Sequence, residues 1–139
     1  MILVLFGQPG SGKTTIAKEL GGMFMSIDGD RFFKVFKNKA EREDAVALLN
    51  KASDIAMFLD STGLDCVISL PYQYKEARHY LNCSKSDVYW VYLKSSREQK
   101  FILDPFDLPD GEDVLEIDTT NISLDKTIQL IENYIDDQW

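Results

Sequence analysis

The residues most able to do chemistry stand near the start of the chain, in the octet Gly7-Gln-Pro-Gly-Ser-Gly12-Lys13-Thr14. The octet fits the phosphate-loop pattern G-x-x-x-x-G-K-[ST] at every fixed position. In such a loop the backbone N–H groups surround the β-phosphate, the lysine reaches the β and γ oxygens, and the threonine hydroxyl coordinates Mg²⁺. The sequence therefore predicts a nucleotide site formed by Gly7, Pro9, Gly10, Ser11, Gly12, Lys13, Thr14 and Thr15.

A pair of carboxylates, Asp28 and Asp30, follows a short apolar segment. If that segment is a strand, both side chains lie at the carboxyl edge of a sheet, where open α/β sheets bind their ligands. A carboxylate in this position can orient an acceptor hydroxyl and take its proton, and Asp30 can share Mg²⁺ with Thr14. The alternative is a turn in which the aspartates cap the following helix.

Short apolar segments that alternate with helical segments must position these residues. The first segment is apolar throughout and ends at Gly7, as is typical of a strand buried on both faces of a parallel sheet. Expected strands cover Ile2–Phe6, Phe24–Ile27, Cys66–Leu70, Val88–Leu93 and, more weakly, Val114–Ile117. The alternation predicts a five-stranded parallel sheet with helices on both faces.

Apolar residues at steps of three and four predict the helices. One helix covers Thr15–Leu20, and a long one includes Ala45–Leu59 and ends near Gly63, a residue suited to the left-handed position after a helix. Ser123 and Asp125 open the last helix. Between these elements, Leu103–Asp113 is rich in Pro, Asp and Gly and predicts an ordered loop.

Composition limits the function further. The 139 residues suffice for one domain, residues 1–139, and their net charge of -8 makes nucleic acid an unfavourable partner. The short apolar start has no basic flank or cleavage segment, so we expect a cytoplasmic protein without a membrane anchor. Cys66 and Cys83 show no disulfide or zinc spacing and are expected to be free thiols.

Other phosphate-loop classes fit less well than kinases. A GTPase needs Asn-Lys-x-Asp late in the chain, whereas the nearest string, Asn38-Lys-Ala-Glu41, comes early. A motor ATPase is expected to end a strand in Asp or Asp-Glu, whereas the third strand here ends in Ser69-Leu-Pro71-Tyr72. An ATP-dependent kinase that transfers the γ-phosphoryl group to a small-molecule hydroxyl is the favoured interpretation, with ATP and Mg²⁺ as cofactors.

The order of the motifs resembles the adenylylsulfate kinase family over nearly the whole chain. After the phosphate loop come Asp-Gly-Asp, then Ile68-Ser69-Leu-Pro71-Tyr72, which is similar to that family's Ile-Ser-Pro-Tyr, then Asp104-Pro105-Phe106, similar to its Asp-Pro-Tyr, and Asp118-Thr119 before the last helix. The resemblance implies a single-domain P-loop kinase-type three-layer fold with a shortened lid. It also implies phosphorylation of the 3′-hydroxyl of adenylylsulfate.

The candidate substrate residues are Arg31, Phe33, Ser69, Tyr72, Arg78 and Phe106. Tyr72 and Phe106 could bracket an aromatic substrate or cover an edge of the core. Arg78 could hold an anionic group or lie on a solvated helical face. Phe33 stands where the family has an arginine, and Leu70 interrupts its Ser-Pro pair.

The lid segment of the family is basic, whereas here Lys94, Arg97 and Lys100 precede a loop without any basic residue. Two alternatives therefore stay open: a kinase for polynucleotide 5′-hydroxyls, and a nucleotide-binding module with little turnover. Homodimerisation is a further expectation.

Overall fold

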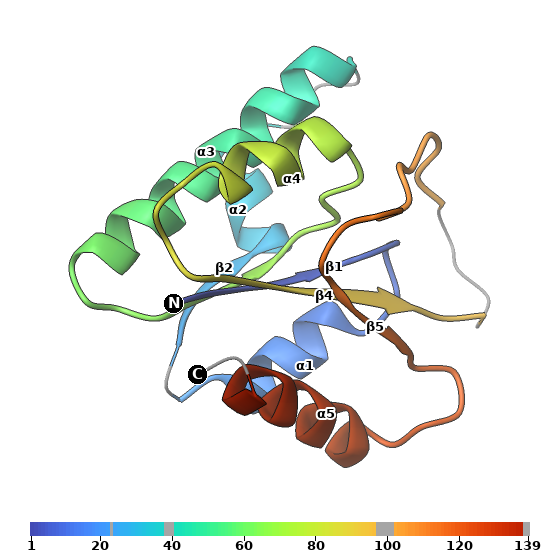
Figure 1. Cartoon of the computed structure of the whole chain (residues 1–139). Helices are drawn as coiled ribbons and strands as arrows, with labels where there is room; N and C mark the ends of the chain where they lie inside the picture. Colours follow the sequence, from blue (N-terminus) through green and yellow to red (C-terminus); the bar gives the residue numbers. More distant parts are fainter. Residues whose placement is uncertain (23, 38–40, 97–101, 138–139) are drawn as a thin grey trace.

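The computed structural model describes residues 1–22, 24–37, 41–96 and 102–137. Within them, five strands and five helices form a single α/β unit (Figure 1). In chain order the elements are β1 (Ile2–Phe6), α1 (Lys13–Leu20), β2 (Met25–Asp28), α2 (Gly29–Val35), α3 (Arg42–Ser61), β3 (Cys66–Ser69), α4 (Lys75–Asn82), β4 (Val88–Lys94), β5 (Leu115–Asp118) and α5 (Leu124–Asp137).

The described strands form one sheet in the order β2-β3-β1-β4-β5, and all neighbouring pairs are parallel. The predicted five-stranded parallel sheet is therefore confirmed, with strand ends that differ from the expected ones by no more than one residue. Strand β1 lies at the centre of the sheet. The helix that follows β1, α1, lies on one face of the sheet, and the helix that follows its neighbour β3, α4, lies on the other. A crevice between the carboxyl ends of β1 and β3 follows from this topology.

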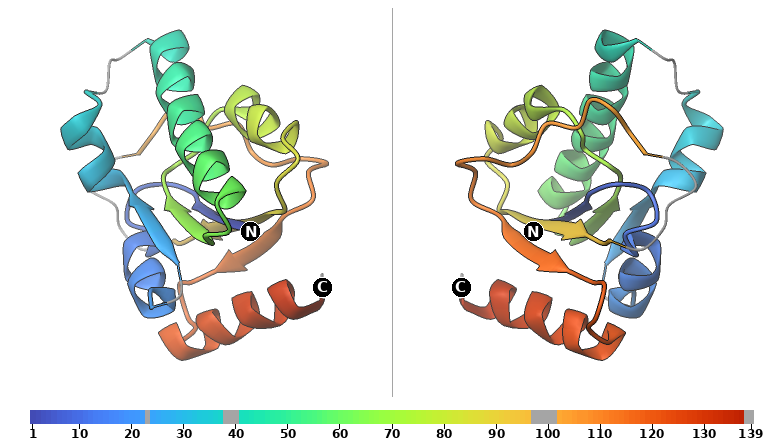
Figure 2. Two further views of the ribbon diagram at one scale, coloured as in Figure 1. Left: turned by 90° about the vertical axis from the view of Figure 1, so that its left-hand side faces the viewer. Right: turned by 90° about the vertical axis from the view of Figure 1, so that its right-hand side faces the viewer.

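Alternate residues of β1 pack into two separate cores, one on each face of the sheet. Ile2, Val4 and Phe6 belong to the core under α3 and α4, whereas Leu3 and Leu5 belong to the core over α1 and α5. Both side views show α3 and α4 on one face and α5 on the other (Figure 2). A strand covered on both faces must be apolar throughout, which explains the unbroken run Ile2–Phe6.

Two helix ends match the sequence signals. Gly63 follows α3 with φ of +88°, the left-handed conformation expected of it. The Ser123 hydroxyl accepts a hydrogen bond of 3.1 Å from the backbone N–H of Lys126 and so caps the first turn of α5. Both ends are therefore determined by local residues.

The expected loop over Leu103–Asp113 is present and is attached to α4 and β3 rather than projecting freely. The backbone N–H of Asp107 donates to the carbonyl of Gln73 at 2.7 Å, and the Asp107 carboxylate accepts from the N–H of Lys75 at 3.0 Å. Arg42 from α3 adds an ion pair of 2.8 Å to the same carboxylate. These contacts hold this segment, residues 102–114 and called the 102–114 loop from here on, beside the carboxyl edge of the sheet.

Candidate active site

The phosphate loop connects β1 to α1 through three glycines with positive φ: Gly7 at 141°, Gly10 at 84° and Gly12 at 99°. At Gly7 a side chain is also excluded sterically, because a Cβ there would lie 2.1 Å from the carbonyl oxygen of Leu93. The N–H of Gly7 donates to the carbonyl of Pro71 at 3.2 Å, which ties the loop to the end of β3. The loop therefore has a fixed conformation, and the positive end of α1 follows it directly.

Lys13 is the charged group of this loop. Its side chain is buried, and its Nζ donates to the carbonyls of Gly7 at 3.0 Å and Gln8 at 2.9 Å. Burial lowers the pKa of Lys13 to about 8, because the ammonium has lost most of its water. An anion placed beside it would supply the missing counter-charge.

The Thr14 hydroxyl and the Asp28 carboxylate lie together at the mouth of the loop. The Oγ1 of Thr14 donates to the Oδ1 of Asp28 at 3.3 Å. Asp28 is the N-cap residue of α2, yet within the described structure its side chain makes no capping hydrogen bond. The capping alternative therefore does not account for Asp28, whose carboxylate is directed at the phosphate loop instead.

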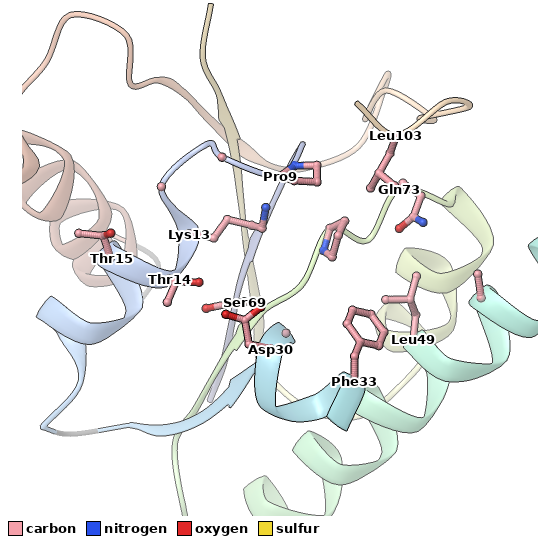
Figure 3. Close-up of a pocket in the computed structure, with 15 residues that line it drawn as sticks. Pro9, Lys13, Thr14, Thr15, Asp30, Phe33, Leu49, Ser69, Gln73 and Leu103 are labelled. Carbon is pink, nitrogen blue, oxygen red and sulfur yellow. The ribbon is translucent and has the colours of Figure 1, made fainter. Parts of the chain in front are cut away.

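Asp30 lies in the first turn of α2. It lines a pocket of about 800 Å³ that opens from the phosphate loop, a volume within the usual range of ligand sites. Figure 3 shows Lys13, Thr14 and Asp30 at one end of this pocket and Phe33 and Leu49 at the other. The pocket therefore has a phosphate end and an inner end.

Of the other candidate substrate residues, Phe33 and Ser69 line the pocket. The Ser69 hydroxyl is buried and has no hydrogen-bond partner among the described residues. Arg31 is exposed on α2 and does not line the pocket. Arg31 therefore does not replace the arginine that the adenylylsulfate kinase family has at the position of Phe33.

Tyr72 has a different position from the one expected. Its side chain is fully buried in the core, where its hydroxyl bonds to the Ser53 hydroxyl at 2.9 Å, and its ring packs edge-on against Trp90. Burial raises the pKa of the phenol above its ordinary value. Its φ of 42° is unusual for a residue with a side chain. In this conformation Tyr72 fills the core and does not line the pocket.

Arg78 and Phe106 are likewise part of the framework. Arg78 is fully buried and makes a two-pronged pair with Glu112, both distances being 2.9 Å. It also donates to the carbonyls of Tyr72 at 2.7 Å and Asp107 at 2.8 Å. Phe106 packs on the core, its ring 6.0 Å from that of Tyr92. Neither side chain lines the pocket, so Arg78 joins α4 to the 102–114 loop instead of meeting a ligand there.

A contact that was not predicted from the sequence joins the phosphate loop to the 102–114 loop. The side-chain amide of Gln8 donates to the carbonyl of Leu103 at 2.9 Å and accepts from its N–H at 2.7 Å. Gln8 occupies a variable position of the loop pattern, which offers no sequence signal. Further lining residues that the sequence analysis did not single out for the site are Gly29, Ala45, Leu49, Pro71, Gln73 and Leu103.

Of the basic residues expected before the loop, Lys94 lies 3.5 Å from Glu116 on the neighbouring strand. Arg97 and Lys100 lie outside the described residues. In the part of the chain that is described, the basic side chain at the phosphate end of the pocket is therefore Lys13.

The residues present fit a magnesium nucleotide. Thr14 and Asp28 supply hard oxygen donors, which Mg²⁺ prefers. Ser11 contributes a buried hydroxyl without a partner among the described residues, inside a loop whose conformation suits phosphate. Groups of three or more His, Cys, Asp or Glu side chains able to hold a metal by themselves are absent from the described structure. A metal here would thus need ligands from outside the protein, as Mg²⁺ takes from phosphates.

Comparisons with known proteins identify the fold. No family model matches the chain, and no curated protein sequence matches it. It superposes on the crystal structure of APE1195 with a TM-score of 0.82 and 22% identity, covering 99% of this chain and 95% of that one. It also superposes on the Mycobacterium tuberculosis APS kinase CysC, solved in complex with AMPPNP and APS. The TM-score is 0.78 at 18% identity, and the match covers 97% of this chain and 96% of that one.

A sugar kinase from Janibacter sp. HTCC2649 gives a TM-score of 0.75 at 18% identity, covering 97% of this chain and 94% of that one. The chain therefore has the fold of the P-loop kinases. Among the helices of the described residues, none combines the length and apolar character needed to span a membrane. Both cysteines are free, Cys66 buried and Cys83 exposed, as expected.

Proposed function

We propose that this protein is a kinase that transfers the γ-phosphoryl group of ATP to the hydroxyl of a small molecule. One observation carries the proposal: a phosphate loop with a buried lysine opens into a pocket of about 800 Å³ that has a carboxylate, Asp30, on its wall. A module that only bound nucleotide would not need a pocket that extends from the phosphate loop past Asp30 to Phe33 and Leu49. The kinase fold supports the same function.

The transfer step follows from these groups. The acceptor oxygen forms a bond to the γ-phosphorus while the bond from that phosphorus to the β–γ bridging oxygen breaks, and the electron pair leaves on ADP. Asp30 takes the proton of the acceptor hydroxyl, and Lys13 with the loop N–H groups stabilises the charge on the phosphates. Protein catalysis here is mainly positioning and charge stabilisation.

The two aspartates would have different roles, Asp28 in binding the metal and Asp30 in facing the acceptor. Asp28 contacts Thr14, so this pair would hold Mg²⁺ beside the phosphates. Asp30 lines the pocket and would face the acceptor. When bound, Mg²⁺ neutralises charge on the phosphate oxygens. From the sequence, Asp30 was expected to accept the proton and to share Mg²⁺, and the contact of Asp28 with Thr14 favours assigning the metal to Asp28.

Adenylylsulfate is the acceptor that the sequence resemblance implies, and slow turnover accompanied by ATP hydrolysis is expected with it. The described 102–114 loop presents Asp104, Asp107, Asp110, Glu112 and Asp113 and no basic residue. Such a loop brings no positive charge to the leaving phosphate. Homodimerisation and a cytoplasmic location remain predictions from the sequence.

Nucleotide binding is tested first by thermal unfolding. Mg-ATP at one hundred times its Kd should stabilise the protein by about 2.7 kcal/mol, and Lys13→Ala should remove most of that stabilisation. An intact protein whose melting temperature does not respond to Mg-ATP would contradict the proposal.

Catalysis is tested by exchanging each aspartate for its neutral isostere. Asp30→Asn should lower transfer about 10²-fold or more while ATP affinity stays within severalfold. Asp28→Asn should instead weaken the dependence on Mg²⁺ and raise the metal concentration needed for half-maximal rate. Normal turnover by Asp30→Asn would exclude it as the proton acceptor, and equal loss of binding and rate would make it a metal ligand.

A further inference from the structure

The inner end of the pocket, on the far side of Asp30 from the phosphate loop, is lined mainly by apolar side chains. Phe33 comes from α2, Ala45 and Leu49 come from α3, and Pro71 and Leu103 come from two connecting segments. Figure 3 shows the amide of Gln73 between Leu103 on one side and Leu49 with Phe33 on the other. An acceptor bound at this end would therefore contact mainly apolar side chains and the amide of Gln73.

Among the described residues, no cationic side chain lines this end of the pocket. Among the described residues that line the pocket, Lys13 is the only cation, and its ammonium is held by carbonyls of the phosphate loop. Two arginines of the neighbouring helices α3 and α4 form ion pairs with other residues. Arg42 pairs with Glu76 and Asp107, and Arg78 is buried and pairs with Glu112. An anionic group at the inner end would thus be desolvated without a counter-ion, which is costly.

Two buried polar atoms of the wall have no hydrogen-bond partner among the described residues. The Oε1 of Gln73 and the Oγ of Ser69 are both inaccessible to solvent and make no hydrogen bond with any described residue. A buried acceptor without a donor costs about 1–3 kcal/mol, so such atoms are normally satisfied by a ligand or by water. Gln73 lines the pocket, so a rotation of its side chain would bring this oxygen to an N–H or O–H donor of a bound molecule.

From the apolar wall and the absence of a cation among its described lining residues, we propose that the inner end selects an uncharged alcohol. Its apolar ring or body packs on Phe33 and Leu49, and an N–H or O–H group donates to Gln73. A sulfated or phosphorylated acceptor is disfavoured. This inference rests on the proposed function and specifies the class of acceptor for that same site.

The test uses matched pairs of acceptors that differ in charge: adenosine against adenylylsulfate, and an aryl glucoside against the corresponding aryl glucuronide. Affinity is measured by calorimetry on the full chain with Mg-AMPPNP present, and kcat/KM is measured with ATP. The neutral member of at least one pair should bind and react at least about tenfold better than its anionic partner.

Two variants locate the selectivity. Gln73→Met should weaken the preferred neutral acceptor about tenfold or more while AMPPNP affinity is retained. Asn50→Leu is the matched control, because Asn50 also carries a buried amide oxygen without a partner but does not line the pocket. Phe33→Arg should shift the preference toward the anionic member by about tenfold.

The outcomes separate the two proposals. Failure to bind Mg-AMPPNP would overturn the proposed function and this inference with it. Normal nucleotide binding combined with a preference for the anionic members, or with no binding by any of the four acceptors, would overturn the inference alone. Equal losses in Gln73→Met and Asn50→Leu would also overturn it, because the effect would then be structural.

Discussion

Nucleotide affinity should fall as the pH rises above about 8, because the cation of the site has a lowered pKa. Burial reduces the pKa of Lys13 from 10.5 to about 8, a difference that corresponds to about 3 kcal/mol. A bound triphosphate supplies the counter-charge and raises that pKa again. Binding is then coupled to protonation of Lys13 at any pH above 8.

The size of the effect follows from this linkage. Below pH 8 Lys13 is already charged and affinity is constant, whereas above it affinity should fall toward tenfold per pH unit until the pKa of the complex is reached. Between about pH 7.5 and about pH 9.5 the expected loss is about 25-fold. Phosphate groups, with a second pKa near 6, are fully ionised throughout this range and do not contribute.

Calorimetric titration with AMPPNP at constant free Mg²⁺ measures the dependence, and two variants act as controls. Lys13→Arg keeps its charge over the whole range, so its affinity should not vary with pH. Lys13→Met should bind weakly at every pH. A flat profile for the intact protein, or the same slope in Lys13→Met, would refute the assignment of the dependence to Lys13.

The same lowered pKa has a consequence for stability without ligand. The unfolded chain binds the Lys13 proton more tightly than the folded one, so stability should rise as the pH goes from about 8 to about 10.5 and stay at its lower level below 8. Lys13→Met should remove this rise. Urea unfolding at several pH values measures it.

Three further predictions concern the framework. Arg78→Met should destabilise the protein by about 3–5 kcal/mol in urea unfolding, since it leaves Glu112 partly buried without its partner, whereas Arg42→Met, which breaks an exposed pair, should cost much less. Tyr72→Phe should cost about 1–2 kcal/mol of stability but leave kcat/KM for the acceptor within about twofold, and a selective loss of kcat/KM would return Tyr72 to the substrate site. Gly7→Ala should prevent the phosphate loop from forming, seen as loss of AMPPNP binding by a protein with altered backbone amide NMR shifts around β1.

Local patterns were sufficient to predict the fold. The apolar run Ile2–Phe6 is buried on both faces, and a run of that kind before a phosphate loop leaves little choice but a central parallel strand. Asp28 and Asp30 were placed at the sheet edge for the same reason, because the end of a strand fixes their position along it. Such inferences depend on residues close in sequence.

The position of Tyr72 could not be predicted in this way. A tyrosine after Pro71 at the end of a strand could face the pocket or the core, and the choice depends on the backbone at Tyr72, whose φ is 42°. That conformation is held by distant groups: Ser53 on α3 bonds its hydroxyl and Arg78 on α4 bonds its carbonyl. Contacts between residues far apart in sequence therefore decide which of the candidate side chains are buried in the core and which line the pocket.

In the proposed function, phosphate binding and acceptor selection depend on separate parts of the chain. The phosphate end uses backbone N–H groups and one buried lysine, all within a single loop fixed by β1 and α1. The inner end takes its wall from α2, α3 and the 102–114 loop, with Phe33 and Gln73 as its distinctive side chains. Because the two sets do not share side chains, acceptor preference can change while nucleotide binding is kept, which is how one fold serves different substrates. Gln8 is the exception, since its amide joins the phosphate loop to Leu103 of the inner wall. Binding of nucleotide and of acceptor should therefore be coupled through this one side chain.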